Sequence, residues 1–348
     1  MTALDGHRQA AYTVTLLDWS DRVVRRLDGV TGGSITLSNA TRLRASGSLN
    51  LTEACGPIDW MTQRVRIDYS MNGAPSWGLG VFLLSAPTRS YSEAGSTWSV
   101  DLSSPLALPD ADCVDRTYTV KAGANLVDVA AGLLREAGLE RLSITPSTAT
   151  ASSDIVYDPG KSRLTIANEL LAAAGYWSAH PDGEGLVHLD PYVRPAARGV
   201  AYDFREGVRA IHLPEWEREL DAASVPNKVV FVSEGSQDKA ALVGVATNED
   251  PASAYSFQAR GRWIVETQTG VEAANQESIN SQARRRLIDV STPSASITLQ
   301  HMPVPLQPNQ VASFSSQGHT ANGVVKEIEY TLDPTALVKT KLMEVTDL

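Results

Sequence analysis

The residues best suited to chemistry lie between positions 180 and 188, in the order His180-Pro181-Asp182-Gly183-Glu184-Gly185-Leu186-Val187-His188. Zinc takes imidazole and carboxylate ligands, and a hairpin would bring His180, Asp182 and His188 together. The Asp-Gly step is also a strong turn former, and the histidines would then be ordinary strand residues. We favour this simpler interpretation, so we expect a hairpin here and no metal site.

Carboxylates are numerous elsewhere, but nothing in their spacing pairs them for acid–base work. Cleavage of a glycosidic bond needs two carboxyl groups facing each other across a sugar. Asp18, Asp21 and Asp28 lie instead at turn positions, where short acidic side chains cap the backbone. The chain has no nucleophile elbow, HExxH pair, P-loop, or GxGxxG leading into a helix. We therefore expect a protein that is not an enzyme and binds no cofactor.

One segment is typical of sugar recognition. Tyr118-Thr119-Val120-Lys121-Ala122-Gly123, followed by a helix, looks like the opening of a LysM glycan-binding module. This alternative would make the chain a cell-wall carbohydrate-binding protein, with Tyr118, Lys121 and Trp177 as the glycan contacts. The rest of the module's pattern is not evident, so a strand, turn and helix without a ligand is the simpler interpretation.

The charge balance argues against sequence-specific DNA binding. Forty acidic residues against thirty basic ones give a net charge of −10, whereas neutralising phosphates requires a surplus of Lys and Arg. The one dense basic run is Arg284-Arg285-Arg286. On a helix its members point about 100° apart, which favours ion pairs or a partner contact over nucleic acid.

The termini and cysteines point to a protein folded in a cytosol. The N-terminus lacks the apolar core of a signal peptide. No apolar run approaches the ~18–20 residues needed to span a bilayer, so we expect no membrane insertion. Cys55 and Cys113 are far apart and lie outside any metal-binding spacing, so no disulfide framework or zinc site follows.

Hydrophobic patterning divides the chain into three parts. Residues 1–115 read as short alternating strands, with Val65, Ile67 and Tyr69 on one face, and Asn72-Gly73 is a strong hairpin signal. Residues 116–198 carry two helical patterns, 125–137 and 163–174, each closing with Leu-Leu-x-x-Ala-Gly. This part is predicted to be a small α/β module.

Residues 199–348 return to the strand pattern with one helix over 273–290. Ile279, Ala283 and Leu287 form its apolar stripe, which predicts a helix laid against β-structure. The predicted fold is thus mainly β with an α+β insert: two tube-like β-barrel domains (1–115 and 199–348) flank a small α/β domain (116–198).

An ordered set of segments resembles the minor tail, or baseplate hub, proteins of long-tailed phages (siphoviruses) that infect actinobacteria. None of the segments is a catalytic motif, and together they cover most of the chain. They are Ile58-Asp59-Trp60, Arg64-Val65-Arg66, the run from Trp77 to Ser85, Tyr118 to Gly123, Tyr176-Trp177, Gly185-Leu186-Val187, Asp190-Pro191-Tyr192, the run from Val225 to Val230, the run from Asn248 to Ser253, and Ala283 to Leu287.

The resemblance implies a plan similar to the hubs of contractile tails. Two barrels per chain in a homotrimer would form a pseudo-sixfold ring at the tail tip of the virion, assembled in the host cytoplasm. The implied partners are the distal tail protein, the tape measure protein and the fibre or spike proteins. DNA would pass through the lumen without specific binding, and three chains would carry a charge of −30, which repels phosphates. Because the chain ends soon after its last predicted strand, we expect no appended hydrolase domain.

Overall fold

A computed structural model describes residues 8–93, 95–220, 224–233, 241–271, 276–290 and 295–345. Contacts divide the chain into two compact units: Met1–Glu217 with Thr298–Asp347, and Arg218–Ile297 with Leu348. Each unit is described by itself. In the part of the chain that is described, no helix combines the length and the apolar character that a bilayer crossing requires.

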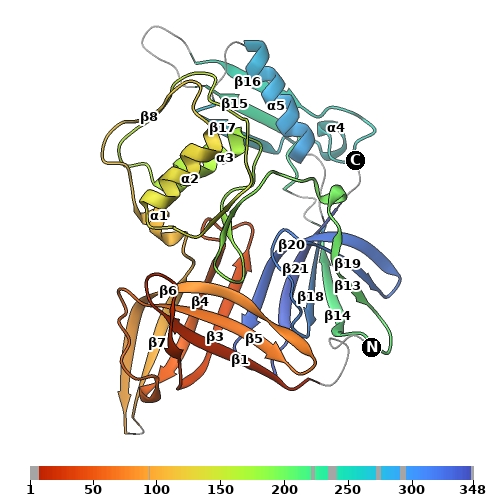
Figure 1. The fold of residues 1–348 in the computed structure, drawn as a ribbon. Coiled ribbons are helices and arrows are strands. Elements are labelled where there is room, and N and C mark those ends of the chain that lie inside the picture. The colour runs from red at the N-terminus through yellow and green to blue at the C-terminus, as the bar shows by residue number, and fades with distance from the viewer. Residues whose placement is uncertain are drawn as a thin grey trace. The chain divides into compact units, whose positions relative to one another are not determined.

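The N-terminal part of the first unit is built from strands, as its alternating pattern predicts (Figure 1). Val65, Ile67 and Tyr69 are at most 1% exposed, so the predicted inward face is confirmed. Asn72 and Gly73 form the two-residue link between paired Met71 and Ala74, with Gly73 at φ +76°. The strands are β1 (Ala10–Leu17), β2 (Val23–Arg26), β3 (Val30–Ser38), β4 (Ala45–Thr52), β5 (Arg64–Met71), β6 (Ala74–Ser92) and β7 (Gly95–Ser103), with a short 3-10 turn at Glu53–Cys55.

The C-terminal strands join the N-terminal ones in one continuous sheet. They are β13 (Val200–Arg205), β14 (His212–Glu219), β18 (Ser296–His301), β19 (Val311–Ser316), β20 (His319–Thr331) and β21 (Val338–Glu344). The strand order is β14-β18-β21-β20-β3-β4-β7-β6-β5-β1-β2, with β19 and then β13 branching from β20. The beginning of β20 pairs with β19, and its end pairs with β3 from Glu327↔Ser38 to Thr331↔Ser34.

This pairing corrects the expectation of two separate barrels. Among the described strands, no pairing closes either half on itself, and the two halves share one sheet because the end of β20 hydrogen-bonds to β3 of the other half. The length of β20 explains the difference. Its thirteen residues reach past β19 and leave a stretch of backbone that must find another partner.

The insert consists of paired helices with short strands. Its elements are α1 (Ala107–Ala111), β8 (Tyr118–Val120), α2 (Leu126–Glu136), β9 (Leu142–Ile144), β10 (Ile155–Tyr157), α3 (Arg163–Ala173), β11 (His180–Pro181) and β12 (Val187–Leu189), followed by a 3-10 turn at Pro195–Ala197. Asn125 caps α2 by accepting from two backbone N–H groups, and Ser162 caps α3. Both predicted glycine ends are confirmed, with Gly138 at φ +91° and Gly175 at φ +76°.

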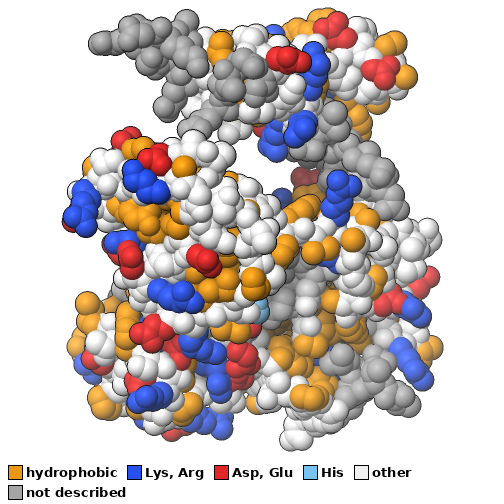
Figure 2. All heavy atoms as spheres, turned by 45° about the horizontal axis from the view of Figure 1, so that its top comes forward, with side chains coloured by type: hydrophobic (Ala, Val, Ile, Leu, Met, Phe, Trp, Pro, Cys, Tyr) orange, Lys and Arg blue, Asp and Glu red, His pale blue; other side chains and the backbone are white. Residues whose placement is uncertain are grey.

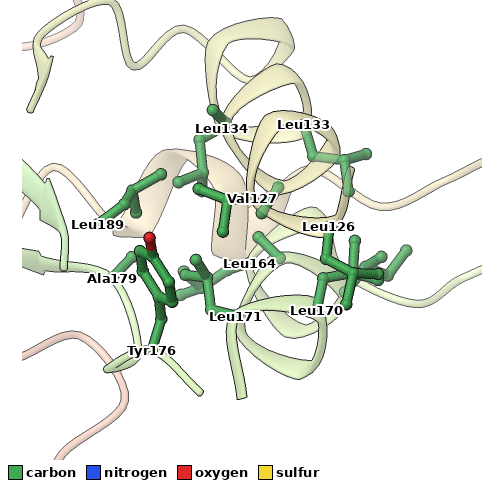
Figure 3. Packing of buried hydrophobic residues seen from close by; sticks show 14 of the residues in the cluster. Leu126, Val127, Leu133, Leu134, Leu164, Leu170, Leu171, Tyr176, Ala179 and Leu189 are labelled. Atoms are coloured by element: carbon green, nitrogen blue, oxygen red, sulfur yellow. The ribbon is translucent and has the colours of Figure 1, made fainter. Parts of the chain in front are cut away.

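The insert core lies between α2 and α3. Leu134, Leu164 and Leu171 lie on the side of Tyr176 and Leu189, whereas Leu126 and Leu170 lie together on the opposite side of the view (Figure 3). The Tyr176 hydroxyl donates to a backbone carbonyl, that of Thr145 at 2.9 Å or of Pro146 at 3.0 Å. Leu126, Leu133, Leu134, Leu164, Leu170 and Leu171 are all at most 4% exposed, so neither helix has to stand alone in water.

The second unit has one helix packed on a three-stranded sheet. Its elements are β15 (Lys228–Val232), β16 (Val243–Thr247), α4 (Phe257–Arg260), β17 (Val265–Thr269) and α5 (Gln276–Val290), and the sheet order is β16-β15-β17. The predicted stripe is confirmed, since Ile279, Ala283 and Leu287 pack on Val229 and Phe231. The predicted helix start, 273–275, lies outside the described residues. Arg286 of the basic run pairs with Glu266 at 2.6 Å.

A buried histidine stands among the C-terminal strands of the first unit. His301 is 1% exposed, packs against the ring of Phe204, and shares a 2.7 Å hydrogen bond with the Thr340 hydroxyl. Its Nδ1 lies 2.7 Å from the Met302 carbonyl oxygen and therefore donates to it, which leaves Nε2 to accept from Thr340. Burial lowers the pKa of His301 to about 4.

This histidine should make the first unit sensitive to acid. The pKa is lower in the folded protein than the 6.5 of an unperturbed histidine, so the unfolded chain binds the proton first. The stabilisation is complete above pH 6.5 and is lost as the pH falls toward 4. We expect His301 to account for a loss of about 2 kcal/mol in the free energy of unfolding between pH 7 and pH 4.5.

Urea denaturation followed by tryptophan fluorescence at several pH values measures this loss, and the variant His301→Gln should show a pH dependence shallower by that amount. The imidazole resonances of His301 in the wild-type protein provide a second measurement. Titration of those resonances near pH 6.5 would contradict the assignment.

Candidate binding site at the junction of three segments

The hairpin predicted around Asp182 is present, and its histidines are cross-strand neighbours. His180 pairs with His188 between β11 and β12, and their rings are stacked with centroids 5.7 Å apart. Asp182 accepts from the backbone N–H groups of Glu184 and Leu186, each at 2.9 Å. The interpretation of Asp182 as a turn residue is confirmed.

The ionisable groups of the hairpin are bound to one another. His188 Nε2 lies 3.0 Å from Asp182 Oδ2, and its Nδ1 lies 3.5 Å from Asp190 Oδ2. His180 Nδ1 donates to the Ser178 carbonyl oxygen at 3.1 Å, and burial is the main cause that lowers the pKa of His180. Across the described residues, no three His, Cys, Asp or Glu side chains are grouped as a metal ion would need.

The turn of this hairpin touches the N-terminal sheet backbone to backbone. A Cβ added to Gly183 would lie 2.1 Å from the carbonyl oxygen of Gly78 on β6, and a Cβ added to Gly78 would lie 2.2 Å from that of Gly183. A Cβ on Gly185 would lie 2.7 Å from the side chain of Val81. Only glycines allow this approach, so the turn holds the insert against β6.

A buried acid forms the second contact between the insert and the N-terminal strands. Asp21 Oδ1 pairs with Arg64 at 3.0 Å, with both side chains under 10% exposed, and Asp21 Oδ2 lies 3.3 Å from Arg141 of the insert. Arg141 also donates to the Glu184 carbonyl oxygen at 2.9 Å. We expected Asp21 to cap its own turn. Asp18 does so instead, accepting from Ser20 and Arg22, and Asp21 binds arginines.

Asn309 joins the C-terminal strands to the same place. Its side-chain oxygen accepts from Asn39 Nδ2 at 2.8 Å, and its carbonyl oxygen accepts from Arg198 Nη1 at 2.6 Å. The backbone of Asn309 is left-handed at φ +69°, a conformation that Asn adopts more readily than most residues. One residue therefore connects the end of β3, the segment after the insert and the β18–β19 loop.

A cavity of about 330 Å³ lies where these three segments meet. Leu37, Leu79, Val81 and Phe82 supply an apolar wall from β3 and β6. The hairpin supplies His180, Asp182, His188 and Asp190, and the β18–β19 loop supplies residues 307–310. Sequence reasoning found the hairpin but missed Arg44, Asn39 and Asn309. Arg44 and Asn39 are near neighbours in the chain, but Asn309 reaches them through a contact between positions 270 apart.

The three residues expected to contact glycan belong to two different clusters. Tyr118 is on β8, packs against the insert core, and has its pKa raised chiefly by burial. Lys121 pairs with Asp154 at 2.8 Å. The rings of Trp177 and Tyr192 are tilted against each other with centroids 4.5 Å apart, and the Arg198 guanidinium lies 4.6 Å from the Trp177 ring. Their role in sugar binding stays a prediction.

The architecture defines the class first: a mainly β chain with a small helical insert, in the fold of phage tail proteins. Three solved structures share it, each over nearly its whole length. The tail protein from Neisseria meningitidis MC58 has a TM-score of 0.66 at 14% identity, with 97% of each chain covered.

The 43 kDa tail protein of prophage MuSo2 from Shewanella oneidensis has a TM-score of 0.67 at 14% identity, covering 97% of this chain and 98% of that one. The prophage tail protein gp18 from Listeria monocytogenes EGD-e has a TM-score of 0.55 at 10% identity, covering 97% and 95%. At these identities the likeness establishes the fold. No family model and no curated protein sequence matches the chain.

Replacing Gly183 tests the backbone contact. Gly183→Ala places a methyl group 2.1 Å from the Gly78 carbonyl oxygen, so β6 and the hairpin must separate. We expect the free energy of unfolding to fall by about 1–3 kcal/mol, measured by urea denaturation.

Gly132→Ala is the matched control, because nothing lies within 4 Å of its added Cβ and Ala favours the helix by up to about 1 kcal/mol. Equal stability of Gly183→Ala and the wild type would show that the insert does not rest on this contact.

Proposed function

We propose that this chain is a structural protein of a phage tail tip: a baseplate hub of the long-tailed type that forms a trimeric ring. The observation that carries the proposal is the fold match over 97% of this chain to two tail proteins that are themselves matched over 97% and 98% of their length. A match of that extent includes the insert and both β-rich parts. It therefore supports a shared whole-chain plan.

The acidic and histidine side chains that could act in catalysis are instead engaged in ion pairs and hydrogen bonds within the protein, which supports a role other than catalysis. Asp21 is held by two arginines. Asp182 and Asp190 orient His188, and His301 is neutral and buried. Catalytic acids and bases need access to a substrate proton, whereas these groups hold segments together.

The ends of the sheet support assembly into a ring. The strand path ends at β2 on one side and at β14 on the other. On β2, Val23 is 64% exposed and Val24 is 49% exposed. An exposed strand edge with apolar side chains is a template for pairing with another chain. In the proposed trimer, neighbouring copies cover these ends and complete the tube-like barrels that one chain leaves open.

The proposed place of the ring is the tail tip of the virion, between the tail tube with its distal tail protein and a fibre or spike, with the tape measure protein nearby. DNA passes through the ring unbound. Acidic and basic side chains are interspersed over the face drawn in Figure 2, which agrees with a surface that does not collect phosphates. The actinobacterial host and the division into domains 1–115, 116–198 and 199–348 are parts of the same proposal.

Mass measurement of the purified protein tests the ring. Three chains of 37.3 kDa give about 112 kDa, and negative-stain images should show a threefold ring. Val23→Lys with Val24→Lys should reduce the particle to one chain, because two charges at an apolar contact cannot be desolvated.

The control is Val156→Lys on β10, also exposed at 60% but away from the ends of the large sheet. It should still assemble. A wild-type protein that is monomeric in solution and absent from purified tail tips would refute the hub.

A further inference from the structure

The cavity at the junction is lined by β3 and β6, the hairpin and the β18–β19 loop. Assembly into a ring does not by itself explain why these segments leave a cavity between them. Its volume of about 330 Å³ lies at the small end of ligand sites, which run from about 300 to 1,000 Å³. It therefore suits a single ring rather than a chain of rings. Phe82, Leu79 and Val81 on its wall are at most 2% exposed, so that wall is rigid.

The polar groups of the cavity include both hydrogen-bond donors and acceptors with unused capacity. Arg44 Nε is buried without a partner, and among the described residues Arg44 forms no ion pair, although one of its other nitrogens donates to the Asn39 carbonyl oxygen. His180 uses Nδ1 to donate, so Nε2 of the neutral ring is an acceptor. Burial lowers the pKa of both side chains.

Two carboxylates on the cavity wall are held in fixed directions. Asp182 accepts from two backbone N–H groups and faces His188. Asp190 accepts from the Thr145 hydroxyl at 2.7 Å. Each carboxylate oxygen can accept a further hydrogen bond. Because both carboxylates are already held in place, binding a hydroxyl donor costs no further side-chain entropy.

The charges on the wall select the class of ligand. One arginine and two carboxylates leave no surplus for a free anion, and the described residues hold no metal-type cluster. Arg44 Nε is buried without a partner, and the side chains of Asp182 and Asp190 are 34% and 38% exposed. A hydroxyl can serve both kinds of group, because it accepts from a guanidinium and donates to a carboxylate. A ring with many hydroxyls and a C–H face also matches the apolar wall.

The geometry points to a binding site for a neutral monosaccharide-sized polyol in this cavity, with Arg44 donating to a ring hydroxyl, Asp182, Asp190 and His180 accepting from others, and the partly exposed rings of Pro181 and Pro308 contacting the C–H face. This site is separate from Tyr118, Lys121 and Trp177. The proposal adds a ligand to the proposed hub. The hub itself is tested separately by the mass of the assembled ring, so either proposal can fail without the other.

Saturation-transfer NMR and calorimetry on the full-length protein test the site, with D-glucose, D-galactose, N-acetyl-D-glucosamine and the charged D-glucuronate as probes. We expect at least one neutral sugar to bind with a Kd below about 1 mM, or about −4 kcal/mol. Arg44→Gln and Asp190→Asn should each raise that Kd at least about tenfold, because each removes a charge-assisted hydrogen bond.

Trp177→Ala and Lys121→Ala are the controls and should leave the Kd unchanged. Asp190→Asn keeps an oxygen that can accept from Thr145, so it provides a second test of the site if Arg44→Gln does not fold. The thermal midpoint of each variant reports whether it is folded. No transfer to any neutral sugar at 10 mM (about tenfold above the expected Kd) overturns the proposal. So does binding of glucuronate alone, or binding that survives both cavity variants and is lost in Trp177→Ala.

Discussion

The structure of the first unit depends on the pairing of β20 with two partners along one edge. The beginning of β20 hydrogen-bonds to β19, and its end hydrogen-bonds to β3. Main-chain hydrogen bonds in a ladder fix both distance and register, so the two β-rich parts cannot turn against each other as domains on a linker would. The ladder is continued by Asn39, whose N–H donates to Lys326 and whose side chain donates to Asn309. The cavity exists because the β20–β3 pairing and the Asn39–Asn309 contact bring β3 and the β18–β19 loop together.

Much of the local structure could be predicted from the sequence, since it depends on neighbours along the chain. The alternation at Val65, Ile67 and Tyr69 has the period of a strand, and Asn72-Gly73 has the backbone freedom of a tight hairpin. The helix stripes that end at Gly138 and Gly175 were found in the same way, and so was the Asp182 turn. In each case the physical cause lies within a few residues.

The remaining features depend on pairs that no local pattern reveals. Nothing near Ser38 specifies that its partner is Glu327, and closing so long a loop costs entropy that only the finished sheet offsets. Gly183 was identified as a turn residue, but its backbone contact with β6 depends on Gly78, which lies in an ordinary strand pattern. Asp21 was assigned to its turn for the same reason, although its carboxylate reaches Arg64 and Arg141.

The Asp21 pair also shows what the polar junction contributes. Desolvating two charges costs several kcal/mol each, so a buried ion pair adds little net stability. The ion pair instead fixes the orientation of the insert relative to β5, because Arg64 of β5 and Arg141 of the insert must both reach the single carboxylate of Asp21. The Gly78–Gly183 contact adds a constraint of distance, since two backbones meet with no side chain between them. An insert held in both direction and distance moves with the sheet.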